Sequence, residues 1–258
     1  MNANNLRSRL AEGRLVIGMM CQSGAPSLVE IMGLSGFDFV IIDMEHGDLD
    51  AFAVVHLVRA AETVGMVPFI RVLENSPTLI MKALGTGAQG VVVPHVNTRE
   101  QAERAVAAAR FAPEGTRGVC PATRAAGYSR AGWDSYHRRA NQELMVIPIV
   151  EEPEGLQNLE AILTVPGIAL FIFGPGDLSQ LLGVPLQGFE NPIMMRELDR
   201  AIEITHRVGA KIMITPQPYL TAEYVRKLVD RGVDCAFFST DHGVFYQACA
   251  GLASIKDA

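Results

Sequence analysis

Residues able to bind metals or anions, or to move protons, stand directly after short apolar runs of the chain. They are Asp43, Glu45 and His46 after residues 39–42, Arg71 after 67–70, Glu151 after 145–150, and Asp177 after 170–173. Carboxylate oxygens are the ligands that hard divalent cations prefer. Arginine binds anions, and imidazole has a pKa suited to a general base near neutral pH. Brought together, these residue types would make a hard-metal site with an anion clamp and a base.

The apolar runs predict the scaffold that would bring these residues together. Eight short runs occur at residues 16–20, 39–42, 67–70, 90–93, 145–150, 170–173, 212–214 and 236–238. Runs without polar alternation are typical of parallel strands buried on both faces. Helical segments separate them, so we expect a single-domain (β/α)₈ TIM barrel over residues 1–258, with strand carboxyl ends facing the active site. The rival is a doubly wound sheet, which usually has a glycine-rich turn after its first strand; residues 21–26 contain one glycine.

Capping signals mark several of the helices. Asp50 is placed to cap a helix at 50–63, Pro77 suits a first helical position, and Thr98 begins a capping-box pattern. The predicted inward-facing stripe of the first of these helices is Phe52, Val55, Val58 and Ala61. Further helical segments are predicted at 154–163, 193–208 and 221–230.

One long connection, residues 113–141, has no predicted regular structure. A loop of this length within a compact domain is usually a lid or binding loop, or else disordered. Its residues Arg117, Arg124 and Arg130 could meet a second carboxylate of a substrate. The alternative is that these arginines are solvated or lie at subunit contacts.

Composition excludes several classes of function. The chain of 258 residues is 49% hydrophobic with a net charge of −6, which excludes disorder and leaves no basic footprint for a nucleic-acid partner. No uncharged stretch reaches the roughly 18 residues of a membrane span, and the N-terminus lacks an apolar signal-peptide core. We therefore expect a cytoplasmic protein with no membrane partner. The four cysteines fall at no metal or redox spacing and are expected to be reduced and mostly buried.

The combination of motifs is similar to that of a known family. It consists of Asp43-x-Glu45-His46-Gly47, Arg71, Glu151 and Gly174-Pro-Gly-Asp177-Leu-Ser. It resembles the HpcH/HpaI family of class II, metal-dependent pyruvate aldolases. The resemblance implies reversible cleavage of 4-hydroxy-2-oxo acids to an aldehyde and pyruvate, or a close 2-oxo acid such as hydroxypyruvate. It also implies a homohexamer in which the last helix is exchanged between subunits. The apolar stripe of that helix, which could equally pack on its own barrel, would be Val244, Phe245, Ala248, Leu252 and Ile255.

The resemblance implies that two of the acidic residues bind a metal ion. It implies that Glu151 and Asp177 hold Mg²⁺, Mn²⁺ or Co²⁺, with open positions for substrate and water. Backbone N–H groups of Gly176 and Asp177 would bind the substrate carboxylate, since Pro175 has none. The alternative interpretation is that these acids cap the helices that follow. The neighbouring Glu152 and Glu154 are taken as solvated or capping residues.

Arg71 and His46 carry the remaining chemistry that the resemblance implies. Arg71 would stabilise the enolate oxygen of pyruvate, and His46 would be the general base, with His95 and His242 as weaker candidates. Asp43 and Glu45 are supporting residues. A salt bridge of Arg71 with either of them is the purely structural alternative, and both roles can hold together.

Other chemistries remain as alternatives. A metal-dependent decarboxylase of 2-oxo diacids would use the same enolate, and a non-catalytic barrel would bind a small acid without turnover. A class I aldolase needs a lysine at the barrel mouth. The four lysines are Lys82, Lys211, Lys227 and Lys256, and none is placed there by the predicted elements.

One segment departs from the family pattern. Many members have Leu-Asp-x-Gly-Ala after the arginine-bearing strand, and that Asp is thought to pair with the catalytic His across a subunit interface. Here Gly85 stands in its place. The partner that orients His46 is therefore open, with Asp43, Glu45 and Asp48 as candidates.

Overall fold

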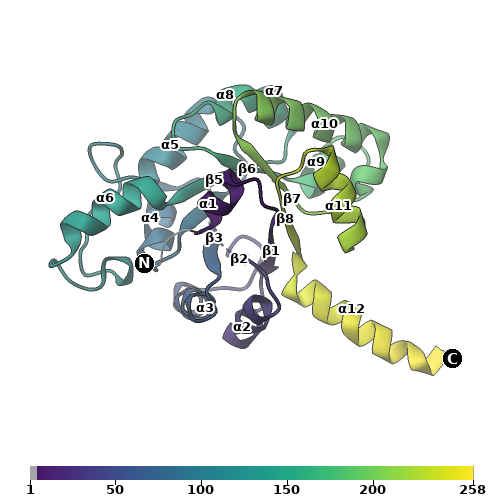
Figure 1. The fold of residues 1–258 in the computed structure, drawn as a ribbon, viewed down its shortest axis with the longest axis horizontal. Coiled ribbons are helices and arrows are strands. Elements are labelled where there is room, and N and C mark those ends of the chain that lie inside the picture. The colour runs from purple at the N-terminus through teal and green to yellow at the C-terminus, as the bar shows by residue number, and fades with distance from the viewer. Residues whose placement is uncertain (1–4, 258) are drawn as a thin grey trace.

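Eight parallel strands close into a barrel in the order in which they occur along the chain (Figure 1). The computed structural model describes residues 5–257. The strands are β1 (Val16–Cys21), β2 (Phe39–Asp43), β3 (Val67–Arg71), β4 (Gly90–Val93), β5 (Met145–Val150), β6 (Leu170–Phe173), β7 (Lys211–Ile214) and β8 (Cys235–Thr240). The predicted (β/α)₈ barrel is thus confirmed, and every predicted run became a strand.

Helices surround the barrel. They are α1 (Asn5–Ala11), α2 (Pro26–Leu34), α3 (Ala51–Thr63), α4 (Pro77–Gly85), α5 (Arg99–Ala109), α6 (Trp133–Glu143), α7 (Pro153–Gln157), α8 (Leu159–Leu163), α9 (Pro175–Leu181), α10 (Pro192–Arg207), α11 (Ala222–Arg231) and α12 (Asp241–Ala253). Three short 3₁₀ helices are η1 (Arg124–Ala126), η2 (Gly188–Glu190) and η3 (Ser254–Asp257). The predicted helix at 154–163 is two short helices that meet at Asn158.

The predicted caps are present, but the inward stripe of α3 is partly wrong. Asp50 accepts a hydrogen bond from Ala53 N at 2.8 Å, and Thr98 and Gln101 form a capping box. Phe52 lies on the outer face of α3 and is 75% exposed. The buried face is Val54, Leu57, Val58, Ala60 and Ala61. The true stripe begins two residues later than predicted because the first turn of α3 faces solvent.

Large side chains fill the inside of the barrel. Phe39 and Phe69 are fully buried there, with ring centroids 5.9 Å apart. A Cβ at Gly18 would overlap the Phe39 ring, and one at Gly90 would lie 2.9 Å from Phe69 Cδ1, so glycine at both positions makes room for the two rings. The interior is therefore a packed core, and a substrate can bind only at an end of the barrel.

The connection 113–141 differs from its prediction, because it contains η1 and most of α6. It joins the end of α5 to the start of β5, and therefore lies at the amino end of the barrel. Arg124 Nη1 donates to Thr86 O at 2.8 Å beside the end of α4, and Arg124 also pairs with Glu62. The segment is thus not a lid over the carboxyl ends of its own strands.

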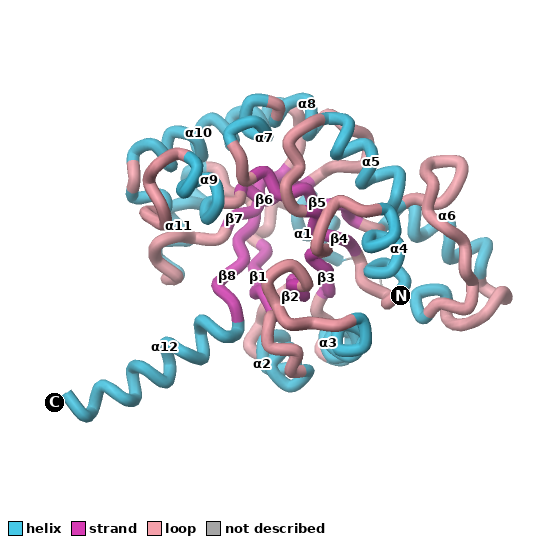
Figure 2. The backbone as a smooth tube through the Cα atoms, turned by 180° about the vertical axis from the view of Figure 1, so that it is seen from behind, coloured by secondary structure: helices cyan, strands magenta, loops and turns pink. Residues whose placement is uncertain are grey.

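The last helix, α12, runs away from the barrel in both Figure 1 and Figure 2. Its only buried residue is Asp241, at the first turn. No helix among residues 5–257 is both long enough and apolar enough to cross a membrane. Of the four free cysteines, Cys21 and Cys235 are buried, whereas Cys120 and Cys249 are exposed, so the prediction of mostly buried thiols is wrong for half of them.

Candidate active site

Arg71 and Asp43 form the buried base of the site. They end neighbouring strands and are paired in register. Arg71 Nε and Nη2 donate to the two Asp43 carboxylate oxygens, each at 2.7 Å, and Arg71 Nη1 lies 2.9 Å from Glu45 Oε2. Burial alone would raise the pKa of Asp43, but the hydrogen bonds and charge of Arg71, together with a bond from Gln22, hold that pKa below its usual range. The predicted structural pairing of Arg71 is therefore present.

Glu151 and Asp177, which we call the acid pair, line one cavity from β5 and the first turn of α9. Glu151 is buried, and its Oε1 accepts from His95 N at 3.0 Å. Burial, with added repulsion from Glu45 and Asp177, raises the pKa of Glu151. A Cβ at Gly174 would lie 2.6 Å from Glu151 Cβ, so the glycine lets β6 pass close behind this carboxylate.

The two histidines at strand ends differ in their surroundings. His46 is half-exposed at the cavity, and its Nε2 is 3.9 Å from Glu45 Oε2. His95 reaches three carboxylates. Its Nδ1 lies 3.0 Å from Glu152 Oε1 and 3.5 Å from Glu151 Oε1, and its Nε2 lies 3.5 Å from Glu45 Oε1. Burial lowers the pKa of His95, but these carboxylates outweigh it and raise the pKa.

His95 and Glu152 have a larger part in the site than the sequence predicted. Glu152 is a hydrogen-bonding partner at the site and not simply a solvated or capping residue. The adjacency of β4 and β5 brings the two residues together. The sequence signal for this contact is a His two residues after the predicted strand 90–93. Glu154 is exposed in the first turn of α7, as predicted. His242 lies in the first turn of α12 and is not among the residues that line the cavity.

His95 has a left-handed backbone conformation, with φ of 54°. A side chain in that region costs about 1 kcal/mol or more, and glycine avoids the cost. We expect His95→Gly to be about 1 kcal/mol more stable than His95→Ala in urea unfolding, although both lack the imidazole. The same pair of substitutions at Glu154, in the first turn of α7, should give the opposite order. Equal stability of the two position-95 variants would contradict a strained backbone there.

The cavity that holds the acid pair has a volume of about 260 Å³. Its lining residues are Met20, Gln22, His46, Arg71, Ile149, Glu151, Ile172, Gly174, Pro175, Gly176, Asp177, Thr215, Gln217, Phe237, Ser239 and Thr240. Carboxylates, a guanidinium and an imidazole thus meet around one space at the carboxyl ends of the strands. That set can bind a divalent cation and an oxyanion, and can accept a proton.

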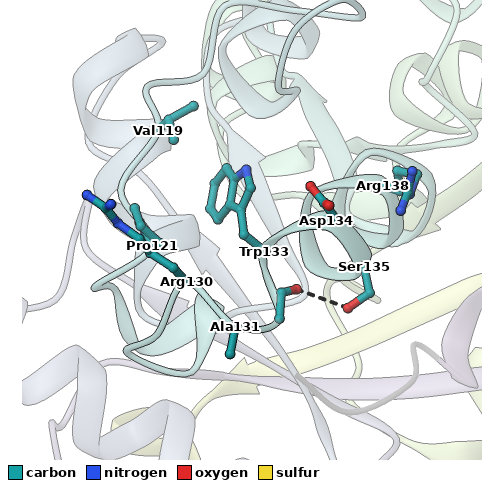
Figure 3. A pocket seen from close by; sticks show the side chains of 9 residues that line it. Val119, Pro121, Arg130, Ala131, Trp133, Asp134, Ser135 and Arg138 are labelled. Carbon is teal, nitrogen blue, oxygen red and sulfur yellow. Dashed lines mark hydrogen bonds between the residues drawn. The ribbon is translucent and has the colours of Figure 1, made fainter.

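A larger cavity of about 720 Å³ lies elsewhere, beside α6 (Figure 3). The Trp133 indole stands between Arg130 on one side and Asp134 and Arg138 on the other, and Ser135 Oγ donates to Gly132 O at 3.0 Å. Its lining contains one carboxylate and no histidine. We therefore place the chemistry in the smaller cavity.

Comparison with known proteins identifies the family of this chain. Residues 16–209 match the family described as HpcH/HpaI aldolase/citrate lyase. A pyruvate aldolase of Rhizobium etli is 37% identical over 253 residues, which cover 97% of this chain and 96% of that protein. The chain belongs to the HpcH/HpaI aldolase/citrate lyase family. A 2-keto-3-deoxy-L-rhamnonate aldolase of Salmonella gallinarum is 39% identical over 189 residues, covering 72% of this chain and 70% of that protein.

A solved structure supports the fold of this HpcH/HpaI aldolase. The crystal structure of an HpcH/HpaI aldolase/citrate lyase family protein from Burkholderia cenocepacia J2315 has a TM-score of 0.90 and is 27% identical. The superposition covers 99% of this chain and 100% of that one. Relatives named as aldolases, matched over most of the chain, identify the enzyme as an aldolase of this family.

Gly85, which stands where many family members have an Asp, lies far from His46 within one chain of the aldolase. Gly85 is the last residue of α4, which begins after the carboxyl end of β3 and ends before the amino end of β4. A Cβ there would meet nothing closer than Thr123 Cγ2 at 3.9 Å, so space does not require glycine. Lys211 also lies at this amino end, with its Nζ 2.8 Å from Asp234 Oδ1.

Proposed function

We propose that the enzyme is a class II aldolase that reversibly cleaves 4-hydroxy-2-oxo acids. The products would be an aldehyde and pyruvate, or a close 2-oxo acid such as hydroxypyruvate. The observation that carries the proposal is the meeting of Glu151, Asp177, Arg71 and His46 around one cavity. The names of the Rhizobium and Salmonella relatives, pyruvate aldolase and 2-keto-3-deoxy-L-rhamnonate aldolase, support the same substrate class.

The acid pair fits a hard divalent cation. Glu151 Oε1 accepts a backbone hydrogen bond, while its Oε2 and the Asp177 carboxylate have no hydrogen-bond partner among residues 5–257. A buried carboxylate beside other acids is costly unless a cation compensates it. Oxygen donors favour Mg²⁺, Mn²⁺ or Co²⁺, and two protein ligands leave positions for substrate and water. When bound, such a cation would polarise the keto group of the 2-oxo acid and stabilise its enolate.

The side chains of this chain would divide the remaining work. Arg71 presents its guanidinium to the developing enolate oxygen, a contact that strengthens as charge accumulates there. The N–H groups of Gly176 and Asp177 would hold the substrate carboxylate. His46 would accept the proton of the C4 hydroxyl as the C3–C4 bond breaks. Its half-exposed imidazole lines the cavity, where a substrate hydroxyl can reach it.

Pyruvate release tests this function directly. A panel of 4-hydroxy-2-oxo acids is incubated with the enzyme, with and without Mg²⁺ or Mn²⁺, and pyruvate is measured as it forms. We expect release that depends on the cation. Decarboxylation of oxaloacetate with no cleavage of any hydroxy-oxo acid would favour the decarboxylase instead, and binding without turnover would favour a non-catalytic barrel.

We propose that the enzyme is a homohexamer that exchanges α12 between subunits. The predicted apolar stripe of α12 and the following η3 divides into two groups. Val244, Phe245 and Ala248 line a groove of about 300 Å³ beside α2. Leu252 and Ile255 lie farther along, and each is 79% exposed. Apolar surface of this kind is typical of a subunit contact.

Charge placed on α12 should break such an assembly. We expect the double variant Phe245→Asp, Leu252→Asp to fall from the mass of six chains to that of smaller species in light scattering coupled to size exclusion. Gln247→Asp, also exposed on α12, adds one such charge without removing apolar surface and should leave the mass unchanged. A wild-type monomer would contradict the proposal.

The enzyme is also proposed to work in the cytoplasm. All four cysteines are free thiols, and Cys120 and Cys249 are exposed to solvent. Exposed free thiols persist in a reducing compartment.

A further inference from the structure

One carboxylate joins the first turn of α12 to the rim of the barrel. Asp241 is the first residue of α12 and the one buried residue of that helix. Its Oδ1 accepts from Gln22 N at 2.9 Å, and its Oδ2 accepts from Ser23 N at 3.1 Å and from the Ser23 hydroxyl. Gln22 and Ser23 directly follow β1, which neighbours β8 in the closed barrel. Asp241 therefore fixes the turn after β1 from the neighbouring strand end.

The Asp241 carboxylate is ionised in this position. Burial alone would raise its pKa, but the hydrogen bonds from Ser23 and from Gln22 N outweigh burial and hold the pKa below its usual range. The Cys21 thiol beside it stays protonated, because burial and the charge of Asp241 raise the pKa of Cys21 to about 12. An ionised acceptor makes stronger hydrogen bonds than a neutral one. The turn after β1 is thus held by charge-assisted bonds.

Gln22 extends this connection into the candidate active site. Its Nε2 donates to Asp43 Oδ2 at 2.6 Å. On the other side, its main chain is confined by the turn that bears His46, since a Cβ at Gly47 would lie 3.2 Å from Gln22 Cα. A side chain with its backbone supported in this way presents its amide at a defined position. The bonds from Asp241 to the Gln22 backbone therefore help to place the group that donates to Asp43.

Asp43 connects Gln22 to the two residues that we propose act on the substrate. The Oδ2 atom that accepts from Gln22 also accepts from Arg71 Nη2 at 2.7 Å. The other oxygen, Oδ1, accepts from Arg71 Nε at 2.7 Å and from His46 N at 3.3 Å. Asp43 is fully buried, so bulk solvent cannot replace these partners. A rotation of this carboxylate would therefore change where the Arg71 guanidinium points.

We propose that Asp241 is a positioning residue for Arg71 and acts through Gln22 and Asp43. Asp241 does not itself line the substrate cavity. This inference rests on the proposed aldolase function, because it concerns the orientation of the guanidinium that would stabilise the enolate. Glu45 Oε2 lies 2.9 Å from Arg71 Nη1 and still supports the guanidinium when the connection to Asp241 is broken, so the expected effect is partial.

Asp241→Asn tests the positioning role with pyruvate as the probe and Mg²⁺ present. The substitution keeps the shape of the side chain but replaces one acceptor oxygen with an amide nitrogen that faces N–H donors. Exchange of the pyruvate methyl protons in D₂O, followed by NMR, reports enolate formation. We expect kcat for exchange to fall about tenfold and KM for pyruvate to stay within about twofold, because a small displacement of Arg71 weakens a contact that strengthens as the enolate forms.

Asp38→Asn is the matched control. Asp38 Oδ2 also accepts a backbone hydrogen bond from the first part of the chain, from Ile17 N at 3.0 Å, but near the opposite end of β1. This variant also loses an acceptor for a backbone N–H group and has no connection to Asp43. Its exchange kinetics should stay within about twofold of the wild type. A tenfold loss of kcat in this control would show that the exchange rate reports any weakening of β1 and would overturn the specific role of Asp241.

A double-mutant cycle with Arg71→Lys separates positioning from a general loss of structure. Lysine cannot use the planar arrangement that Asp43 holds. If Asp241 acts through Arg71, Asp241→Asn should cost about tenfold in the wild type and less than about threefold in Arg71→Lys, because effects transmitted through one residue are not additive. An equal loss in both backgrounds, no loss in either, or a rise in KM alone would overturn the positioning role.

The wild type separates this inference from the proposed function. Absence of methyl exchange in the wild type with Mg²⁺ or Mn²⁺ would overturn the aldolase function and this inference with it. Normal exchange in the wild type combined with additive losses in the cycle would overturn only the inference. If Asp241→Asn fails to fold, Gln22→Met removes the donor to Asp43 while leaving Asp241 in place, and it enters the same cycle with the same expected result.

Discussion

Glu151→Gln should lower the apparent affinity for Mg²⁺ or Mn²⁺ by well over tenfold. The substitution keeps the shape of the side chain but removes one of the two carboxylates of the acid pair. A tenfold change corresponds to about 1.4 kcal/mol, which is modest for removing a charge from a buried cation site. Metal titration of the aldolase rate gives the affinity. Glu154→Gln, three residues away and exposed on α7, should bind the metal as the wild type does. Full aldolase activity in excess chelator would contradict the class II mechanism.

The same substitution should change the pH dependence of stability without metal. Burial raises the pKa of Glu151 above its ordinary value of 4.5. Between that value and the raised one, the folded chain binds more protons than the unfolded chain, so its stability falls as pH rises. The glutamine of Glu151→Gln cannot ionise, so the stability of this variant should not fall with pH for that reason. Urea unfolding in chelator, from pH 4.5 upward, should therefore show a smaller decline for the variant, and an equal decline would argue against a raised pKa.

The barrel could be predicted because its strands are buried on both faces, which leaves long apolar runs in the sequence. Their carboxyl ends must share one rim, so Asp43, Arg71, Glu151 and Asp177 could be placed together without coordinates. Helix α6 was missed because the residues around it are polar and rich in arginine. Its inward face rests on few side chains, such as Tyr136 and Ala140.

Contacts between neighbouring strand ends were harder to predict than the strands themselves. His95 meets Glu152 only because β4 and β5 are adjacent and because the His95 backbone is left-handed. The predicted barrel makes β4 and β5 neighbours, but the residue types give no sign of the left-handed backbone at His95. The polar character of Thr215 and Gln217 is visible in the sequence, but whether their side chains are already paired depends on three-dimensional neighbours.

A substitution at Arg71 separates a role in substrate binding from a role in catalysis most clearly. Its three nitrogens are arranged by Asp43 and Glu45, so the guanidinium is fixed before any substrate arrives. Arg71→Lys keeps the positive charge but cannot make this planar, three-nitrogen arrangement. An interaction that strengthens as the enolate forms affects kcat more than KM. We therefore expect kcat to fall about 10–100-fold, with KM changing only a few-fold. Thermal unfolding of the variant shows whether the site is still folded around the buried Asp43. A rise in KM at unchanged kcat would make Arg71 a residue that binds substrate and transition state equally.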